Sequence, residues 1–129
     1  MTMQLIYPNK QSENQIIAQA ERIPPLALNK PLPLLFFGDN FHALSALLKS
    51  GYRERIDLIY IDPPYNTQQN FTVSDGRSST ISRTNYGIAA YSDSRSMEEY
   101  LEFMRERLIL MRELLSPCGS IYVHIDSKV

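Results

Sequence analysis

The stretch LIYIDPPYNT, residues 58–67, joins a strong strand signal to two residues that end strands. Its first four residues are apolar, and they continue a segment from Arg55 that is rich in β-branched and aromatic side chains. Nearly continuous apolarity of this kind is typical of a central parallel strand that is covered on both faces. We therefore predict a strand over residues 55–61 that ends directly before Asp62.

Two prolines directly follow this aspartate. Proline fixes its own φ angle, lacks an N–H group and pushes the preceding residue out of the helical region. Asp62 and Pro63 each precede a proline, so both backbones are held extended. The carboxylate of Asp62 and the neighbouring carbonyl groups then form a rigid cluster of acceptors beside the flat ring of Tyr65. Such a cluster can bind a planar group with two N–H donors, and a plain Pro-Pro turn is the alternative interpretation.

The segment before this strand predicts another strand and a helix. Residues 34–37 (LLFF) form a short apolar run that predicts a buried strand, which stops at Gly38. Asp39 or Asn40 can cap the helix that follows, and Gly51 can end it. Strand, helix and strand in this order make a βαβ unit. We therefore predict an α/β fold with a partial parallel sheet and helices on both faces.

The longest predicted helix spans residues 97–115 and begins after Ser96, which is a favourable cap. Its expected core face consists of Tyr100, Phe103, Met104, Leu108, Met111 and Leu115. Arginines and glutamates alternate along its other positions, so we expect Arg105, Arg107 and Arg112 to lie on a solvated face.

A turn at SPCG then leads into a third predicted strand, residues 120–125, which ends at Asp126. The three predicted strands thus end in Asp39, Asp62 and Asp126. Ligands of open parallel sheets bind outside the carboxyl ends of the strands, so these acids could face one crevice. Asp39 and Asp126 are also ordinary cap or turn residues, whereas Asp62 is harder to explain in that way.

Two regions lie outside this framework. Residues 1–33 contain a capping box at residues 12–15 and a short helical segment, followed by half of the chain's eight prolines, and we predict an N-terminal arm or linker. Residues 66–96 are rich in Ser, Thr, Asn and Gly and show little periodicity. We expect this segment to be a long loop, which either is solvated and mobile or contacts a substrate.

The composition is that of one small globular domain of 129 residues with a net charge of −1. A nucleic-acid module that acts alone usually has a basic face, so the charge gives no argument for a nucleic-acid partner. The single Cys118 cannot build a disulfide framework, and there is no signal-peptide pattern or membrane-length apolar run. We expect a cytoplasmic protein without a membrane segment and without a bound metal.

Four motifs occur in order: LLFFGDNFHALSALL, IDLIYIDPPYNT, NFTVSD and RELLSPCGSIYVHID. Together they resemble the amino-methyltransferases of bacterial restriction–modification systems, which methylate adenine N6 or cytosine N4 in DNA. The likeness covers residues 34–128 and is strongest to the branch that includes the modification subunits of type III systems. It implies that residues 34–129 are the N-terminal part of a Rossmann-like, S-adenosylmethionine-dependent catalytic domain.

The resemblance also implies catalytic roles. Asp62, Pro63, Pro64 and Tyr65 match the family's catalytic motif, in which the aspartate carboxylate and the first proline's carbonyl accept the two amine hydrogens of the target base. The tyrosine stacks on a base that is flipped out of the duplex. An aspartate at the head of this motif favours adenine N6, whereas a serine is more usual for cytosine N4.

Further positions follow from the same resemblance. Asp39, Asn40 and Asp62 are the expected contacts to S-adenosylmethionine. Substrate contacts are expected from Tyr65, Asn66, His124 and Asp126, although a single strand histidine is more often structural. Double-stranded DNA is the implied substrate, and a homodimer and a restriction subunit are possible partners of the full-length form.

The chain also departs from the family pattern. Its five glycines lack the spacing of the FxGxG-like loop that grips the methionine end of the cofactor, and no large target-recognition region follows the catalytic motif. We therefore expect a truncated, inactive fragment that alone binds S-adenosylmethionine weakly or not at all and does not methylate DNA. The alternatives are a non-catalytic α/β module that binds a nucleotide or a partner, and a methyltransferase for an amine or amide of a non-DNA substrate.

Overall fold

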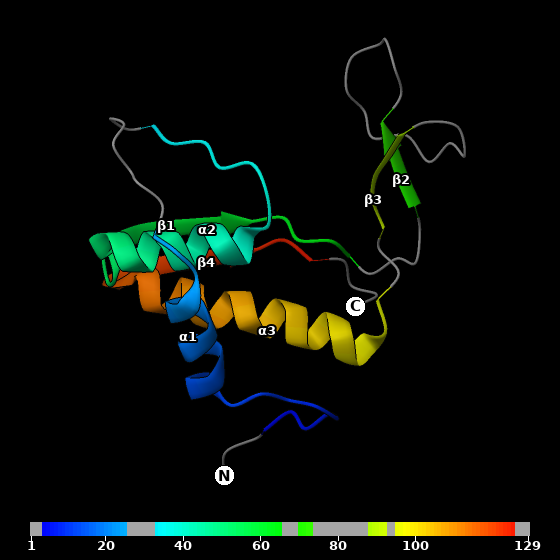
Figure 1. The fold of residues 1–129 in the computed structure, drawn as a ribbon, viewed down its shortest axis with the longest axis horizontal. Coiled ribbons are helices and arrows are strands. Elements are labelled where there is room, and N and C mark those ends of the chain that lie inside the picture. The colour runs from blue at the N-terminus through cyan, green and yellow to red at the C-terminus, as the bar shows by residue number, and fades with distance from the viewer. Residues whose placement is uncertain (1–3, 26–32, 66–69, 74–87, 93–94, 126–129) are drawn as a thin grey trace.

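The computed structural model of the chain describes residues 4–25, 33–65, 70–73, 88–92 and 95–125 (Figure 1). Its elements, in chain order, are α1 (Glu13–Arg22), α2 (Asn40–Leu47), a π-helical turn η1 (Leu48–Tyr52), β1 (Ile56–Ile61), β2 (Asn70–Val73), β3 (Ile88–Ser92), α3 (Met97–Leu114) and β4 (Leu115–Val123). β1 and β4 form a parallel sheet, and α3 belongs to the connection between them. The predicted α/β class with a parallel sheet is confirmed.

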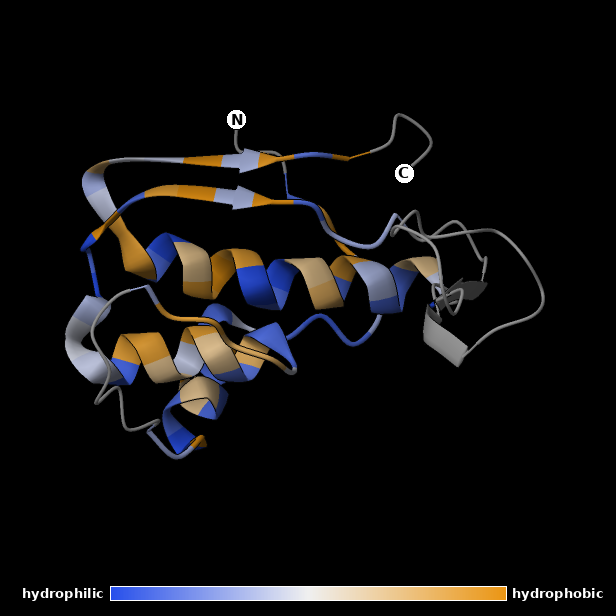
Figure 2. Cartoon of the chain, turned by 90° about the horizontal axis from the view of Figure 1, so that it is seen from above, coloured by the Kyte–Doolittle hydropathy of each residue, from blue (hydrophilic) through white to orange (hydrophobic). Residues whose placement is uncertain are grey.

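The described helices all lie on one side of this sheet. Figure 2 shows the sheet, then α3, then α1 and α2 as successive layers. On the opposite face of the sheet, Leu58 is 61% exposed and Tyr60 is 68% exposed. The expectation that helices cover both faces of the sheet is therefore not met by the residues that the structure describes.

β4 contains a bulge where it approaches β1 closely. Ile56 lies opposite Leu115, whereas Leu58 lies opposite Ser120, so β4 carries extra residues between these two pairs. Gly119 lies in this bulge, and a Cβ atom there would be 2.7 Å from the backbone oxygen of Ile56. The SPCG segment is thus a bulge within a strand and not the predicted turn before one, and its close approach to β1 requires glycine.

Replacing Gly119 with alanine should destabilise the fold, because the added methyl group overlaps the backbone carbonyl of Ile56. We expect the free energy of unfolding, measured by urea denaturation, to fall by about 1–3 kcal/mol. Ser120→Ala changes the adjacent exposed position to the same residue and should shift that free energy by less than about 0.5 kcal/mol. Equal stability of the two variants would contradict the close approach.

Helix α1 is part of the hydrophobic core. The core cluster consists of Ile16, Ala20, Ile109 and Leu110, with Ile17, Phe41, Leu44 and Leu48 packed against it. The capping box predicted for residues 12–15 is present: Ser12 accepts from the N–H of Gln15, and the Gln15 side chain accepts from the N–H of Ser12. α1 therefore contributes buried side chains although it belongs to the predicted N-terminal arm.

Helix α3 begins after the predicted cap Ser96, which forms a second capping box with Glu99. Its buried residues are Tyr100, Arg107, Ile109, Leu110, Met111 and Leu114. Only Tyr100 and Met111 belong to the predicted core face, so the prediction of that face is wrong at its other positions. The buried residues surround the helix because the sheet lies on one side of α3 and the other helices lie on the other side (Figure 2). Among the described residues, no helix has the length and apolarity that crossing a membrane requires.

The strand predicted for residues 34–37 is absent. Residues 33–37 are described but form no strand, and Leu35 and Phe37 are almost fully exposed. An apolar run becomes a strand only when a neighbouring strand pairs with its backbone N–H and C=O groups. In the described part of the chain, β1 and β4 pair with each other, and neither of them pairs with residues 34–37.

The expected loop at residues 66–96 contains two short strands. β2 and β3 pair antiparallel, with Asn70 opposite Ser92 and Val73 opposite Ile88. NFTV and IAAYS contain the β-branched and aromatic residues that favour strands, and this signal was too short to show a period. The prediction of a loop is thus wrong for these two segments, and the rest of the range lies outside the described residues.

Candidate functional site

The parallel pairing of β1 and β4 brings Asp62 and His124 together at the carboxyl ends of the two strands. The backbone N–H of His124 donates to the carbonyl oxygen of Ile61 at 3.0 Å, which continues the ladder one residue beyond the pair Ile61–Val123. The His124 Nδ1 atom lies 3.1 Å from Oδ1 of Asp62. The predicted convergence concerned Asp39, Asp62 and Asp126, of which Asp126 lies outside the described residues. The residue that the strand pairing brings to Asp62 is His124.

Tyr65 completes a three-residue cluster with Asp62 and His124. Its hydroxyl group donates to Oδ1 of Asp62 and lies 2.8 Å from Nδ1 of His124. The rings of Tyr65 and His124 meet edge to face, with centroids 5.8 Å apart and planes at 85°. The chain thus turns at Pro63 and Pro64, so that Tyr65 lies against the carboxyl end of β1.

This cluster keeps the Asp62 carboxyl group ionised. The hydrogen bond from Tyr65 lowers the pKa of Asp62 below its usual value, and the contact with His124 lowers it further. A depressed pKa means that the carboxylate form persists to lower pH. An ionised carboxylate only accepts hydrogen bonds, so Asp62 presents an acceptor at neutral pH.

The site opens into a cavity of about 290 Å³ between the end of β1 and α3. One wall is formed by residues 60–64, and the others by Asn40 and Arg107 and by the apolar side chains of Phe103, Met104 and Met111. This volume is close to the lower limit of small-molecule sites. The cavity therefore suits one planar heterocycle, with apolar walls for its faces and acceptors at one edge.

Arg107 is buried beside this cavity, with 7% of its surface exposed. Its Nη2 atom donates to both carboxylate oxygens of Asp39, at 3.2 and 3.0 Å, and its Nε atom donates to Oδ1 of Asn40 at 2.6 Å. Its guanidinium group lies over the ring of Phe103, 3.7 Å from the centroid. The prediction that Arg107 belongs to a solvated face is therefore wrong.

Asp39 is the N-cap of α2, as predicted, because its carboxylate accepts from the N–H of Phe41 at 2.7 Å. Asp39 also forms an ion pair with Arg107. It therefore lies at the edge of the site without lining the cavity, whereas Asn40, the next residue, does line it.

Comparison with known proteins identifies the family of the chain. The N6/N4 DNA methylase family matches residues 56–129, more than half of the chain. The chain belongs to this DNA methylase family. The matched region begins with β1 and includes Asp62, Tyr65 and His124.

Several curated DNA methylases are similar to this family member. It is 41% identical to the type II methyltransferase M.EcaI of Enterobacter cloacae, a match that covers 97% of this chain and 26% of M.EcaI. It is 35% identical to the Mod subunit of the type III restriction-modification enzyme EcoPI of Escherichia phage P1, over 74% of this chain and 17% of that subunit. The EcoP15I Mod subunit of Escherichia coli gives 34% over 72% of this chain and 16% of its own length. The chain thus spans about a quarter or less of these relatives.

No solved structure matches the chain significantly. The fold and the site geometry of this methylase-family chain are therefore described from its own structure alone.

The structure brings together six of the predicted site residues: Asp62, Pro63, Pro64, Tyr65, His124 and Asn40. Asn66 and Asp126 lie outside the described residues.

Arg107 is the site-forming residue that the sequence pattern did not identify. It lies four residues after Phe103 and four before Met111, so it occupies the inward stripe of α3. This helical spacing could have indicated that Arg107 faces inward. The alternation of Arg and Glu along α3 instead favoured the interpretation as a solvated face.

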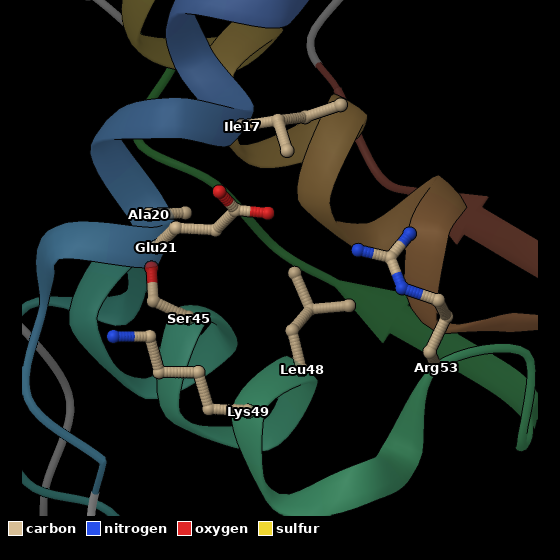
Figure 3. Close-up of a pocket in the computed structure, with 7 residues that line it drawn as sticks. All are labelled: Ile17, Ala20, Glu21, Ser45, Leu48, Lys49 and Arg53. Atoms are coloured by element: carbon tan, nitrogen blue, oxygen red, sulfur yellow. The ribbon is translucent and has the colours of Figure 1, made fainter.

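A second cavity, of about 200 Å³, lies away from the Asp62 cluster. Figure 3 shows that α1 contributes Ile17, Ala20 and Glu21, and that the α2–η1 segment contributes Ser45, Leu48 and Lys49. The Lys49 amine donates to a backbone carbonyl of Ile23, which ties η1 to the end of α1. None of the predicted site residues lines this cavity, so we assign it no role in the methylase site.

Tyr65→Phe should raise the pKa of Asp62, because the hydrogen bond from the Tyr65 hydroxyl group is the largest cause of its depression. The side-chain carboxyl carbon of Asp62, followed by NMR as the pH is lowered, should then titrate at a higher pH than in the unmodified chain. Tyr52→Phe removes a hydroxyl group from the end of η1, which precedes the amino end of β1, and should leave this titration unchanged. An identical Asp62 titration curve in all three proteins would rule out the role given to Tyr65.

Proposed function

We propose that this chain forms the amine-binding part of a DNA methyltransferase that acts on adenine N6. The observation that carries the proposal is the ionised Asp62 carboxylate, which lies beside the Pro63 carbonyl group and the Tyr65 ring at the carboxyl end of β1. Family membership supports transfer to an exocyclic amine of DNA. The choice of adenine over cytosine depends on the aspartate that heads the motif.

Asp62 is suited to activate an amine that is conjugated to a heterocycle. Both described contacts of its carboxylate go to Oδ1, which leaves Oδ2 for an N–H of the amine. The carbonyl oxygen of Pro63, held by two successive prolines, can accept from the second N–H. Two such hydrogen bonds draw the amine nitrogen out of the ring plane, so its lone pair becomes available to form a bond to carbon. The carboxylate can also take up the proton that the amine then loses.

The apolar wall of the cavity provides one face for a planar base, and we propose the Tyr65 ring, which is bonded to Asp62 but does not line the cavity, as the stacking partner. The Tyr65 ring is half-buried and held at the strand end by its hydroxyl group. Stacking of a base on an aromatic ring is worth about 1–3 kcal/mol and tolerates any base. The orientation of the base is therefore expected to come from the Asp62 side of the cavity, and its affinity largely from stacking.

S-adenosylmethionine, when bound, would supply the methyl group. We propose Asp39, Asn40 and Asp62 as the residues of this chain that contact it. Asn40 and Asp62 fit this role because both line the cavity. The Asp39 carboxylate is already shared between the α2 cap and Arg107, so it fits best as a group at the edge of that contact.

Partners of the whole protein are proposals of the same kind. Double-stranded DNA is the proposed substrate because the family matched here is one of DNA methylases. A homodimer and a restriction subunit are proposed from the likeness to Mod subunits of type III restriction-modification enzymes.

A hybrid enzyme can test the reaction. This chain would replace the matching quarter of M.EcaI, to which it is 41% identical, and methyl transfer from radiolabelled S-adenosylmethionine to DNA would be measured. Asp62→Ala should reduce transfer at least about a hundredfold, because the amine loses its acceptor. Mass spectrometry of the digested DNA should show N6-methyladenine.

Asp57→Asn is the matched control for this experiment. Asp57 lies on the same strand, is exposed, and accepts only a hydrogen bond from Ser116 at 2.7 Å in the described residues. The control hybrid should transfer methyl groups normally. An Asp62→Ala hybrid that is as active as the control would refute the proposed role of Asp62, and N4-methylcytosine as the product would refute the choice of adenine.

A further inference from the structure

Every nitrogen atom of the Arg107 guanidinium group donates to a protein acceptor. Beyond the bonds to Asp39 and Asn40, its Nη1 atom donates to the carbonyl oxygen of Phe103 at 3.0 Å and to the Glu106 carboxylate at 3.3 Å. All three guanidinium nitrogen atoms thus have protein acceptors, and the two bonds from Nη2 reach the two oxygens of one carboxylate. Arg107 therefore connects Asp39 and Asn40 to α3 and organises its neighbours at the wall of the cavity.

The bond to Asn40 determines which way the Asn40 amide faces. The Nε atom of Arg107 is always a donor, so the group of Asn40 that meets it at 2.6 Å must be the oxygen. The amide then has its NH₂ group, which can only donate, for interaction with a ligand. Because Asn40 lines the same cavity as Asp62, the cavity has acceptors from Asp62 and Pro63 and a donor from Asn40.

This set of groups is complementary to an amidine edge. In adenine, the amine that would donate to Asp62 is attached to the carbon next to N1, a ring nitrogen that only accepts. A donor near the amine-binding acceptors can read that ring nitrogen. An amine on a ring without a neighbouring acceptor would leave the Asn40 NH₂ group without a partner, which costs affinity.

Helix capping alone does not explain the buried arginine. Asp39 already caps α2 through the N–H of Phe41, and an apolar side chain would fill the space beside Phe103 without the cost of burying a charge. An apolar residue could replace neither the ion pair with Asp39 nor the bond that orients Asn40, and of these two partners only Asn40 lines the cavity.

We propose that Arg107 is a positioning residue that holds Asn40 with its NH₂ group available to the cavity, where Asn40 donates to the ring nitrogen beside the amine bound by Asp62. Cytosine has the same edge, so the choice of a 6-aminopurine as the ligand class follows from the proposed function. The 6-aminopurine is either the flipped target base or the adenine of the methyl donor. This inference rests on the proposed function and deepens it, because it assigns the recognition of the ring as well as of the amine.

The sharpest test is Asn40→Asp in the 129-residue chain. A carboxylate at position 40 still accepts the bond from Arg107 and is favourable in the first turn of α2, but it cannot donate. Binding of adenosine and of 1-deazaadenosine, which keeps the amine and lacks the ring acceptor, would be measured by NMR titration. Asn14→Asp makes the same change at an exposed position of α1 and is the matched control.

The unmodified chain and the Asn14→Asp control should prefer adenosine over 1-deazaadenosine by about fivefold, the value of one hydrogen bond. Asn40→Asp should abolish this preference while the spectrum shows an unchanged fold. Arg107→Lys keeps a charge for Asp39 but loses the Nε–H that orients Asn40, so it should also reduce the preference. No measurable adenosine binding by the unmodified chain, or a preference that survives Asn40→Asp, would overturn the proposal.

Two further titrations distinguish the source of the purine. If S-adenosylhomocysteine shifts the Asn40 side-chain amide signals, Asn40 reads the methyl donor, and if a short oligodeoxyadenylate shifts them, it reads the target base. A shift with neither ligand would overturn the inference. These binding measurements need no methyl transfer, so an inactive hybrid enzyme with intact adenosine selectivity would refute the proposed reaction and leave the recognition inference standing.

Discussion

The parallel pairing of β1 with β4 is the constraint on which the candidate site depends. The ladder sets Ile61 opposite Val123 and is continued by the hydrogen bond from His124 to Ile61. This register places Asp62 and His124 at the same edge of the sheet, within reach of the Tyr65 hydroxyl group. A shift by one residue would turn these side chains to the other face and dissolve the cluster. The close approach at Gly119 helps to keep that register.

A second constraint joins the other side of the cavity to the helical layer. Arg107 extends from α3 to the start of α2 and satisfies Asp39 and Asn40 together. The cavity thus lies between a rigid strand end and a helix start that is held by a buried charge. A hydrogen-bonded network of this kind stabilises one arrangement when its polar groups have partners, and every guanidinium nitrogen of Arg107 has one.

The sequence predicted those features that depend on neighbouring residues. The end of β1 and the caps at Ser12, Asp39 and Ser96 were predicted and are confirmed. Predictions that needed a distant partner were less successful. Residues 34–37 were apolar enough for a strand but found no partner strand, and Arg107 was placed in solvent because its partners on α2 lie 67 and 68 residues away in the chain.

The sequence by itself therefore determined a rigid acceptor cluster at the end of a strand, because proline geometry is local. It also carried the motifs that identify the family. Only the tertiary structure decided that His124 meets Asp62, that Tyr65 closes the cluster, and that Arg107 turns inward to orient Asn40. In each of these contacts, the distance between the residues depends on sheet register or on helix packing. Sheet register and helix packing cannot be predicted from the residue spacing within one segment.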